Sequence, residues 1–249
     1  MKIVVIGGTG LIGSKLVEKL RGRGHEPLAA APNTGVNTLT GEGLAGALEG
    51  AHAVVDVSNA PMGDDAALME FFQTSSRNLS SAEVAADVKH HVLLSIVGAD
   101  HLPDSGYLRA KVAQEQTVEA GPVPYTILRA SQFFEFIGRL ADGPDGEAVH
   151  LAPVFVQPES ADDVAAALAD ISLGEPMNDI LELGGPDQFR LDDIVRRVLR
   201  ARNDPRPVTA DVHARYFGTE LEERSLTPGS NARIAPTRFD DWLDQSAAG

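Results

Sequence analysis

A tyrosine and a lysine four residues apart, Tyr107 and Lys111, form the pair with the clearest chemical use in this sequence. On a helix the two side chains share one face, about one turn apart. Because a neighbouring ammonium favours the phenolate, we expect Lys111 to lower the pKa of Tyr107 from its ordinary value of about 10. Such a tyrosine can donate a proton to a carbonyl oxygen, or remove one in the reverse direction. Ser95, at the end of the preceding predicted strand, could hydrogen-bond the same oxygen. Taken alone, Tyr-x-x-x-Lys is a common chance pattern, and a solvated helix start with a surface lysine is the alternative.

The first fourteen residues hold a second chemical signal, a glycine-rich turn between a predicted strand and a predicted helix. An apolar run at 3–6 leads into the turn, and an amphipathic helix follows at once. Glycines let the backbone approach a pyrophosphate closely, and free N–H groups at the helix N-terminus face the anion. An ordinary turn is the alternative, but it would not need so many glycines. We predict that a dinucleotide binds here, with contacts from Gly7, Thr9, Gly10, Leu11, Ile12 and Gly13.

The end of the second predicted strand, at 25–31, bears on which dinucleotide binds. In dinucleotide-binding folds an Asp or Glu at this point holds the adenosine ribose hydroxyls of NAD. This chain has no carboxylate at 30–34, so nothing there would repel the 2′-phosphate of NADP. The sequence therefore favours NADP, with NAD as the alternative, and makes Asn33 and Thr34 candidate contacts. These two could also be turn residues only.

Strands and helices are predicted to alternate along the first part of the chain. Apolar runs predict strands at 3–6, 25–31, 53–57, 91–97 and 125–129, with a short further strand near 36–39. This alternation predicts an α/β fold, a doubly wound parallel sheet of Rossmann type. Because ligands bind at the carboxyl edge of such sheets, Val57, Ser58 and Asn59 are further cofactor candidates, with a polar turn before Pro61 as the alternative.

The pattern changes after residue 140. A turn cluster at 142–146 precedes short predicted strands near 149 and at 154–157, and a helix with a capping box begins at Ser160. We therefore divide the chain into a dinucleotide-binding domain, 1–140, and a smaller C-terminal α/β substrate portion, 141–249, that packs against it. The predicted strand at 125–129 is followed by Gln132, Phe133 and Phe134, which are candidate substrate contacts. Packing at the junction of the two parts is an equal alternative for the phenylalanines.

Composition limits the kinds of partner and site. The 249 residues are 43% hydrophobic and 23% charged, which is typical of a globular protein, and the net charge of −15 argues against nucleic acid or an anionic membrane as the partner. The lack of cysteine excludes disulfides and thiolate metal sites, and fits a cytoplasmic location. We expect no signal peptide, no membrane span and no metal site. The sequence carries no signal for the oligomeric state. Surface or strand-edge positions are expected for His90, His91, His101, His150 and His213.

Together these motifs resemble those of the short-chain dehydrogenases/reductases, and within them the atypical or extended, NmrA-like branch. The resemblance lies in Gly7-Gly-Thr-Gly-Leu-Ile-Gly13, Asp56-Val-Ser-Asn59, Ser95-Ile-Val-Gly98, Tyr107-x-x-x-Lys111, Tyr125-Thr-Ile-Leu-Arg129 leading to Phe133-Phe134, and Ser160-Ala-Asp-Asp-Val-Ala165. It implies an NAD(P)-binding Rossmann domain with a small C-terminal substrate portion.

We expect an oxidoreductase that transfers hydride between NADP and a carbonyl or alcohol. Tyr107 would be the general acid/base, Lys111 its electrostatic partner and a ligand of the nicotinamide ribose, and Ser95 the contact to the substrate oxygen. The phenylalanines suggest an apolar or aromatic small-molecule substrate. Two alternatives stay open, an epimerase that retains its cofactor and a non-catalytic, redox-sensing regulator of NmrA type that binds NADP(H).

Overall fold

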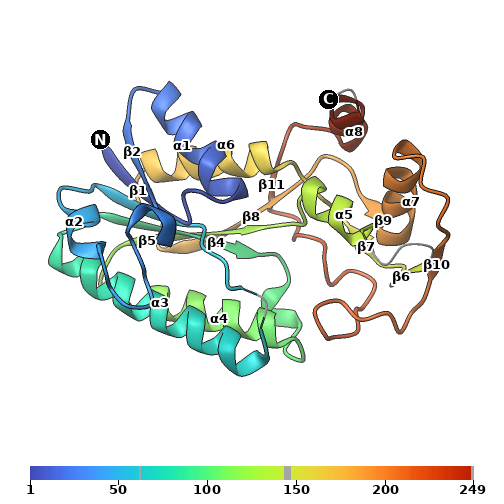
Figure 1. Ribbon diagram of the computed structural model, residues 1–249, viewed down its shortest axis with the longest axis horizontal. Helices are drawn as coiled ribbons and strands as arrows, with labels where there is room; N and C mark the ends of the chain where they lie inside the picture. The colour runs from blue at the N-terminus through green and yellow to red at the C-terminus, as the bar shows by residue number, and fades with distance from the viewer. Residues whose placement is uncertain (62, 143–146, 248–249) are drawn as a thin grey trace.

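The computed structural model describes residues 1–61, 63–142 and 147–247, and a parallel β-sheet forms its centre (Figure 1). Among these residues the sheet has seven strands, in the order β11-β8-β5-β4-β3-β1-β2, and every pairing in it is parallel. The predicted doubly wound α/β fold is therefore confirmed. The strands are β1 Lys2–Ile6, β2 Glu26–Ala30, β3 Ala53–Asp56, β4 His90–Ile96, β5 Tyr125–Ala130, β8 Asp179–Gly184 and β11 Arg233–Ile234.

Helices cover both faces of this sheet (Figure 1). On one face lie α1 (Leu11–Gly22) and α6 (Ala161–Leu173), which contact each other. On the other face α3 (Asp65–Ala85) packs along α4 (Gly106–Glu119), and the short α2 (Leu44–Leu48) contacts α3. Because both faces are covered, central strands such as β3 are buried at every position and read as continuous apolar runs.

Two local predictions were wrong. Residues 36–39 form no strand, because the Asn37 side chain accepts a hydrogen bond from Leu39 N and its carbonyl accepts one from Gly41 N, which closes a turn. Of the surface or strand-edge position expected for His90 and His91, the surface alternative is wrong, because the two residues form the start of β4 with 1% and 5% of their surface exposed. The prediction is confirmed for His101, His150 and His213, which are exposed.

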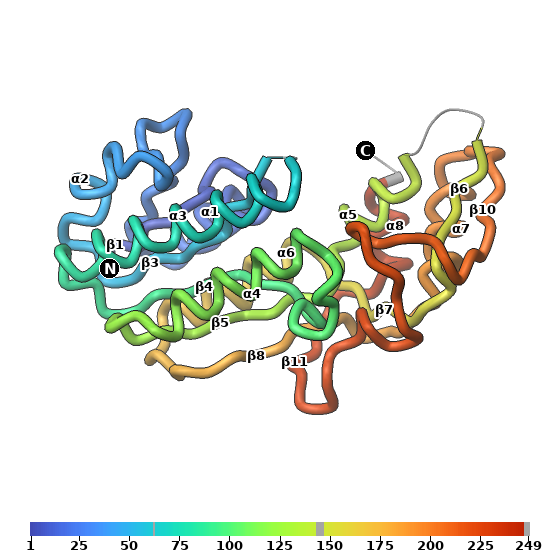
Figure 2. The backbone as a smooth tube through the Cα atoms, turned by 90° about the horizontal axis from the view of Figure 1, so that it is seen from below, coloured from blue at the N-terminus to red at the C-terminus, as the bar shows by residue number. Residues whose placement is uncertain are grey.

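The remaining elements gather at one end of the sheet, on the right in Figure 1 and Figure 2. Small sheets form where β6 pairs with β10 and β7 with β9. These elements are α5 Phe134–Leu140, β6 Val149–Leu151, β7 Phe155–Val156, β9 Phe189–Arg190, α7 Leu191–Ala201, β10 Val208–Ala210 and α8 Phe239–Ala247. They share a hydrophobic core that is separate from the core between the sheet and α1 and α6.

The later part of the chain also contributes β8 and β11 to the main sheet, and α6 packs on one face of it beside α1. The division at residue 140 therefore remains a proposal, and the part of the predicted turn cluster at 143–146 lies outside the described residues. Ser160 begins α6 as expected, because its hydroxyl accepts a hydrogen bond from Asp163 N at 3.0 Å. No helix within the described ranges is long and apolar enough to cross a membrane.

Candidate functional site

The glycine turn leaves no room for a side chain at Gly7 or Gly13, where β1 passes into α1. Gly7 has a φ of +77°, and a Cβ there would lie 2.9 Å from Ser58 N. A Cβ at Gly13 would overlap the Gly7 carbonyl oxygen and lie 2.7 Å from Gly8 Cα. No described side chain caps the N-terminus of α1, and its first turn contains no acidic residue. The residues present therefore fit a dinucleotide, whose phosphates would face open N–H groups at a positive helix end.

In the turn after β2, the two polar candidates for contact with the adenosine end of a cofactor, Asn33 and Thr34, have different surroundings. The Thr34 hydroxyl accepts from Ala31 N at 2.9 Å and contacts the carbonyl of Ala29 at 3.0 Å, so it serves the turn itself. Asn33 is exposed, and Thr9 Oγ1 donates to its Oδ1 at 3.3 Å. Thr9 and Asn33 are therefore the polar side chains presented beside the glycine turn.

The loop after β3 lies between the glycine turn and Tyr107. Asp56 Oδ1 accepts a hydrogen bond from Ser58 N at 2.9 Å, and Val57 N donates to the Ile6 carbonyl at 3.0 Å. Tyr107 Oη donates to Asn59 Oδ1 at 3.1 Å. The fold thus brings the cofactor candidates of two loops to the same sheet edge as the predicted acid/base.

Tyr107 sits among aromatic rings at the start of α4. Its ring centroid lies 6.1 Å from that of Phe72 and 4.9 Å from that of Phe217. Burial raises the pKa of Tyr107 to about 12, although the hydrogen bond to Asn59 acts in the other direction. The expected lowering of this pKa is therefore wrong for this structure, because the cost of burying a phenolate outweighs any help from Lys111.

Lys111 is on the face of α4 that packs against β4, and only 3% of its surface is exposed. Its Nζ donates to the Leu94 carbonyl at 2.9 Å and to Gln114 Oε1, and it lies 4.9 Å from the centroid of the Phe72 ring. Burial lowers the pKa of Lys111 to about 8, and the charges of Asp56 and Glu115 limit that shift. Its ammonium is thus held by β4 and by its own helix.

Ser95 lies in β4 on the face that α4 covers. Leu93, two residues earlier on the same face, packs against Val118 of α4. Ser95 is buried, and its Oγ has no hydrogen-bond partner among the residues that the structure describes. This buried hydroxyl has hydrogen-bonding capacity to spare, and its contact to a substrate oxygen remains a prediction.

An ion-pair cluster that sequence reasoning missed, with Arg129 and Glu115 buried and Asp100 exposed, fixes α4 against β5. Arg129 donates to both carboxylate oxygens of Glu115, at 2.9 and 2.6 Å, and to Asp100 Oδ2 at 2.8 Å. A bidentate pair of this kind sets orientation as well as distance. Because Glu115 is on the helix that carries Tyr107 and Lys111, the cluster positions both. Its members lie on separate elements, so no local spacing in the sequence signals it.

The three predicted substrate contacts have different surroundings. Phe134 is fully buried, and its ring packs against Phe239 at 5.3 Å and Trp242 at 5.4 Å, so the packing alternative describes it. Gln132 is buried, and its Oε1 accepts from Ser131 Oγ at 3.1 Å. Phe133 immediately precedes α5 and packs against the core beside α6.

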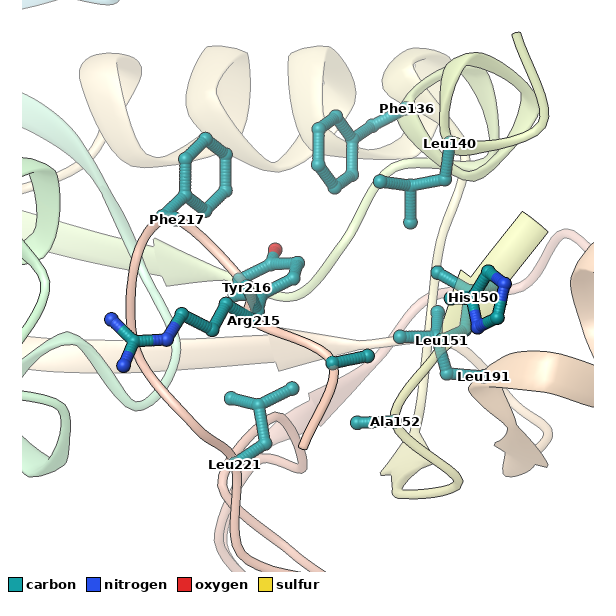
Figure 3. Close-up of a pocket in the computed structure, with 11 residues that line it drawn as sticks. Phe136, Leu140, His150, Leu151, Ala152, Leu191, Arg215, Tyr216, Phe217 and Leu221 are labelled. Carbon is teal, nitrogen blue, oxygen red and sulfur yellow. The ribbon is translucent and has the colours of Figure 1, made fainter. Parts of the chain in front are cut away.

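A pocket of about 170 Å³ lies between α5, β6 and the loop at 214–221 (Figure 3). Arg215 extends away from it and donates to the Gly218 carbonyl. Phe217 has a backbone φ of +46°. Its ring stacks on that of Phe136, with centroids 5.8 Å apart, and also contacts the ring of Tyr107. Phe217 therefore lies between the pocket and the predicted acid/base. Apolar side chains dominate the walls, among them Phe136, Leu140, Leu151, Leu191, Phe217 and Leu221.

Sequence reasoning missed this loop, because residues 203–238 have weak periodicity. Its signal was an aromatic pair before a glycine, Tyr216-Phe217-Gly218, within a polar segment. In the described ranges, no group of three or more His, Cys, Asp or Glu side chains is placed to hold a metal ion.

Comparisons with known proteins agree with this geometry. The family described as NAD(P)H-binding matches residues 7–173. The Photosystem II assembly factor Ycf39 of Synechocystis is 28% identical over 156 residues, which cover 57% of this chain and 48% of that protein. The chain thus matches about half the length of this relative. Ycf39 of Trieres chinensis is 24% identical over 217 residues, which cover 78% and 67%.

Solved structures with the same fold include nucleotide-sugar enzymes. MoeE5 in complex with UDP-glucuronic acid and NAD has a TM-score of 0.78 at 19% identity, with 100% of this chain and 98% of that chain covered. UDP-N-acetylglucosamine 4-epimerase from Bacillus cereus has a TM-score of 0.75 at 18% identity, with 100% and 96% covered. The dTDP-4-dehydrorhamnose reductase from Bacillus anthracis, in complex with NADP, has a TM-score of 0.71 at 12% identity, with 98% and 96% covered. At these identities the likeness concerns the fold.

Proposed function

Because the chain belongs to the NAD(P)H-binding family, we propose that it catalyses the NADPH-dependent reduction of an apolar carbonyl compound. Its motifs and fold are those of the extended, NmrA-like short-chain dehydrogenases/reductases, in which NAD(P) is the cofactor. One observation carries the proposal. The Tyr107 hydroxyl contacts the loop beside the glycine turn, through Asn59, while its ring contacts the wall of an apolar pocket, through Phe217.

When bound, a reduced nicotinamide supplies the hydride for the carbonyl carbon. Tyr107 then donates its phenolic proton to the carbonyl oxygen, and the unpartnered Ser95 hydroxyl hydrogen-bonds the same oxygen. A pKa of about 12 keeps Tyr107 protonated at neutral pH, which suits a proton donor and disfavours alcohol oxidation, because oxidation needs the phenolate. Lys111 would hold the cofactor ribose beside this group.

NADP is proposed over NAD because Thr9 and Asn33, rather than a carboxylate, flank the adenosine end of the glycine turn. The remaining cofactor contacts are the backbone groups of 7–13 and of 57–59. Calorimetric titration with NADPH and with NADH is the direct test. Tighter binding of NADH would overturn this choice.

The pocket supports a small apolar substrate rather than a nucleotide sugar. Its volume of about 170 Å³ compares with cavities of roughly 150 Å³ that hold a single aromatic ring. Its walls are mostly apolar and offer few partners for hydroxyl or phosphate groups. We therefore propose aromatic aldehydes, ketones or quinones as the substrate class. The same argument speaks against the epimerase alternative.

The test compares the wild-type chain with Tyr107→Phe in NADPH oxidation against a panel of aromatic and aliphatic carbonyls. Loss of the proton donor should lower kcat by about 10²–10⁴-fold. NADPH affinity should stay within about twofold, since the substitution removes only one hydroxyl. Tyr125→Phe is the matched control. Tyr125 is the first residue of β5 and so lies at the edge of the sheet opposite the candidate site, and this variant should keep full activity. Activity that survives Tyr107→Phe would disprove the assigned mechanism.

A non-catalytic NADP(H)-binding regulator is the second candidate. It is supported by the name of the Ycf39 relatives, which are called assembly factors, and by the Tyr107 hydroxyl being bound to Asn59. Tight NADPH binding without oxidation by any carbonyl of the panel would favour this candidate. Protease protection of the chain by NADPH, compared with NADP, would then show whether it responds to the redox state.

A further inference from the structure

Hydrogen bonds and a short stretch of backbone form a path that leaves α4 at Tyr107 and returns to it at Gln114, whose side chain contacts Lys111. Tyr107 Oη donates to Asn59 Oδ1, and the neighbouring Ser58 N donates to Asp56 Oδ1. The path continues from the other carboxylate oxygen, Asp56 Oδ2, which accepts from Gln114 Nε2 at 2.9 Å. Gln114 Oε1 accepts in turn from Lys111 Nζ. One amide side chain therefore joins the lysine to the loop after β3.

The two ends of this amide are not interchangeable. An ammonium can only donate, so the Gln114 carbonyl oxygen must face Lys111. The carboxylate of Asp56 can only accept, so the Gln114 NH₂ group must face it. Gln114 has no exposed surface, and a buried amide satisfied at both ends has little freedom to turn. Its orientation is thus set by charge on both sides.

We propose that Gln114 is a positioning residue for the Tyr107–Lys111 pair, which holds the Lys111 ammonium in place and ties it to the Ser58–Asn59 loop. It touches neither the cofactor nor the substrate in the proposed reaction, and it acts through Lys111 and Asp56. The inference deepens the proposed function, but its effect on NADPH binding requires only that the chain binds the cofactor of its family.

Charged groups reach Lys111 from its neighbouring elements. Asp56 lies at the end of β3, and Glu115 lies next to Gln114 on α4, where Arg129 of β5 already pairs with it. From α3 the neighbour is the neutral ring of Phe72, and from β4 it is a backbone carbonyl. Gln114 is therefore the neutral group through which the charge of Asp56 is connected to Lys111.

The test uses two variants that should move the titration of Lys111 in opposite directions. Gln114→Glu places a carboxylate against the ammonium, and Gln114→Leu removes its acceptor. We would measure NADPH affinity from nicotinamide fluorescence between pH 6 and 10. The wild-type chain should lose affinity with a midpoint of about pH 8, as Lys111 loses its charge. Gln114→Glu should raise this midpoint by about one pH unit, and Gln114→Leu should lower it by about the same amount.

Gln116→Glu and Gln116→Leu are matched controls, because Gln116 is exposed on the same helix. Both should keep the wild-type midpoint, and circular dichroism is the check that all four variants are folded. A purely structural role would weaken binding equally at every pH without moving the midpoint, and that result would overturn the proposal. So would shifts of the same sign in both Gln114 variants, or no midpoint in the wild-type chain. Opposite shifts in a chain that reduces no carbonyl would support the positioning role while the proposed reduction fails.

Discussion

Gly13 is the residue of the glycine turn with the least space around it. A Cβ there would meet Gly7 and Gly8 backbone atoms, which cannot rotate away as a side chain can. Gly13→Ala must therefore shift α1 relative to β1. We expect a loss of about 1–3 kcal/mol in the free energy of unfolding, and at least a tenfold loss of NADPH affinity because the helix N-terminus moves. Urea denaturation and NADPH titration measure the two effects.

Gly22, in the last turn of the same helix, is the matched control. Apart from its chain neighbours and the backbone of its own helix, no described atom lies within 4 Å of the place where its Cβ would be. Gly22→Ala should leave NADPH affinity unchanged and stabilise the chain by about 0.5–1 kcal/mol, since alanine loses less backbone entropy in a helix. Equal effects of the two substitutions would contradict the steric argument.

His90 gives the chain a predicted sensitivity to acid. It is buried in β4, its Nε2 lies 2.9 Å from Thr126 Oγ1, and burial lowers its pKa from 6.5 to about 4. Between these two pH values His90 is protonated in the unfolded chain but neutral in the folded chain. This contribution to stability is present above pH 6.5 and is lost as the pH falls through 4. The free energy of unfolding should therefore fall over this window, less steeply in His90→Gln.

Urea denaturation at a series of pH values from 4 to 7 checks this slope. His101→Gln is the control, because His101 is exposed and should leave the slope unchanged. The adjacent His91 acts in another window. Its pKa is raised by Glu83 despite burial, so its contribution is present below pH 6.5 and is lost at higher pH. An unchanged slope in His90→Gln would disprove the acid effect of His90.

At the scale of elements, α8 is held to α5 by aromatic contacts. Phe239 is 1% exposed and packs between Phe134 and Trp242, with ring centroids 5.3 and 5.9 Å away. Removal of a buried phenylalanine ring costs about 3–5 kcal/mol, which is enough to detach a short terminal helix. Because Trp242 is the one tryptophan of the chain, Phe239→Ala should shift the tryptophan emission to longer wavelength. Gln245→Ala, exposed on the same helix, should leave the emission unchanged.

Elements of the sheet could be predicted because their signals are local. The apolar run of β1, the glycine turn and the capping serine of α6 each act within a few residues. The false strand at 36–39 arose where short-range side-chain hydrogen bonds of Asn37 decide the conformation. His90 and His91 were misplaced because their burial depends on helices from elsewhere in the chain. The loop at 214–221 has no periodic pattern, and its Tyr216 and Phe217 rings contact each other and the distant Phe136 of α5.

The site shows the same limit. Spacing alone placed Tyr107 and Lys111 on one helix face, and the structure has them on α4. The spacing could not predict the direction of the Lys111 ammonium, because the partners of this group come from β4 and, through Gln114, from β3. It could not predict that burial raises the pKa of Tyr107 either, since Phe217 comes from a loop more than one hundred residues later.

At the scale of the whole molecule, strand order brings the binding and reacting groups to one sheet edge. In the sheet β1 is followed by β3, β4 and β5, so the glycine turn, Asn59, Ser95 and the start of α5 follow one another along the carboxyl edge. The pocket is lined by residues of α5, β6 and the loop at 214–221. In Figure 2, α5 and β6 lie among the elements at one end of the sheet. A cofactor on this edge would contact several elements at once, and its binding should therefore stabilise the entire fold.

NADPH should accordingly raise the melting temperature of the chain. At a concentration one hundred times its Kd, a ligand that binds only the folded state adds about 2.7 kcal/mol. For a chain of this size that corresponds to roughly 5–10 °C. Differential scanning fluorimetry should show this rise in the wild-type chain and in Tyr107→Phe, which keeps the cofactor contacts, and a much smaller rise in Gly13→Ala. Because the adenosine end lacks a carboxylate, NADH at the same concentration should raise the melting temperature less, and a larger rise with NADH would mean that Asn33 and Thr9 do not select the 2′-phosphate.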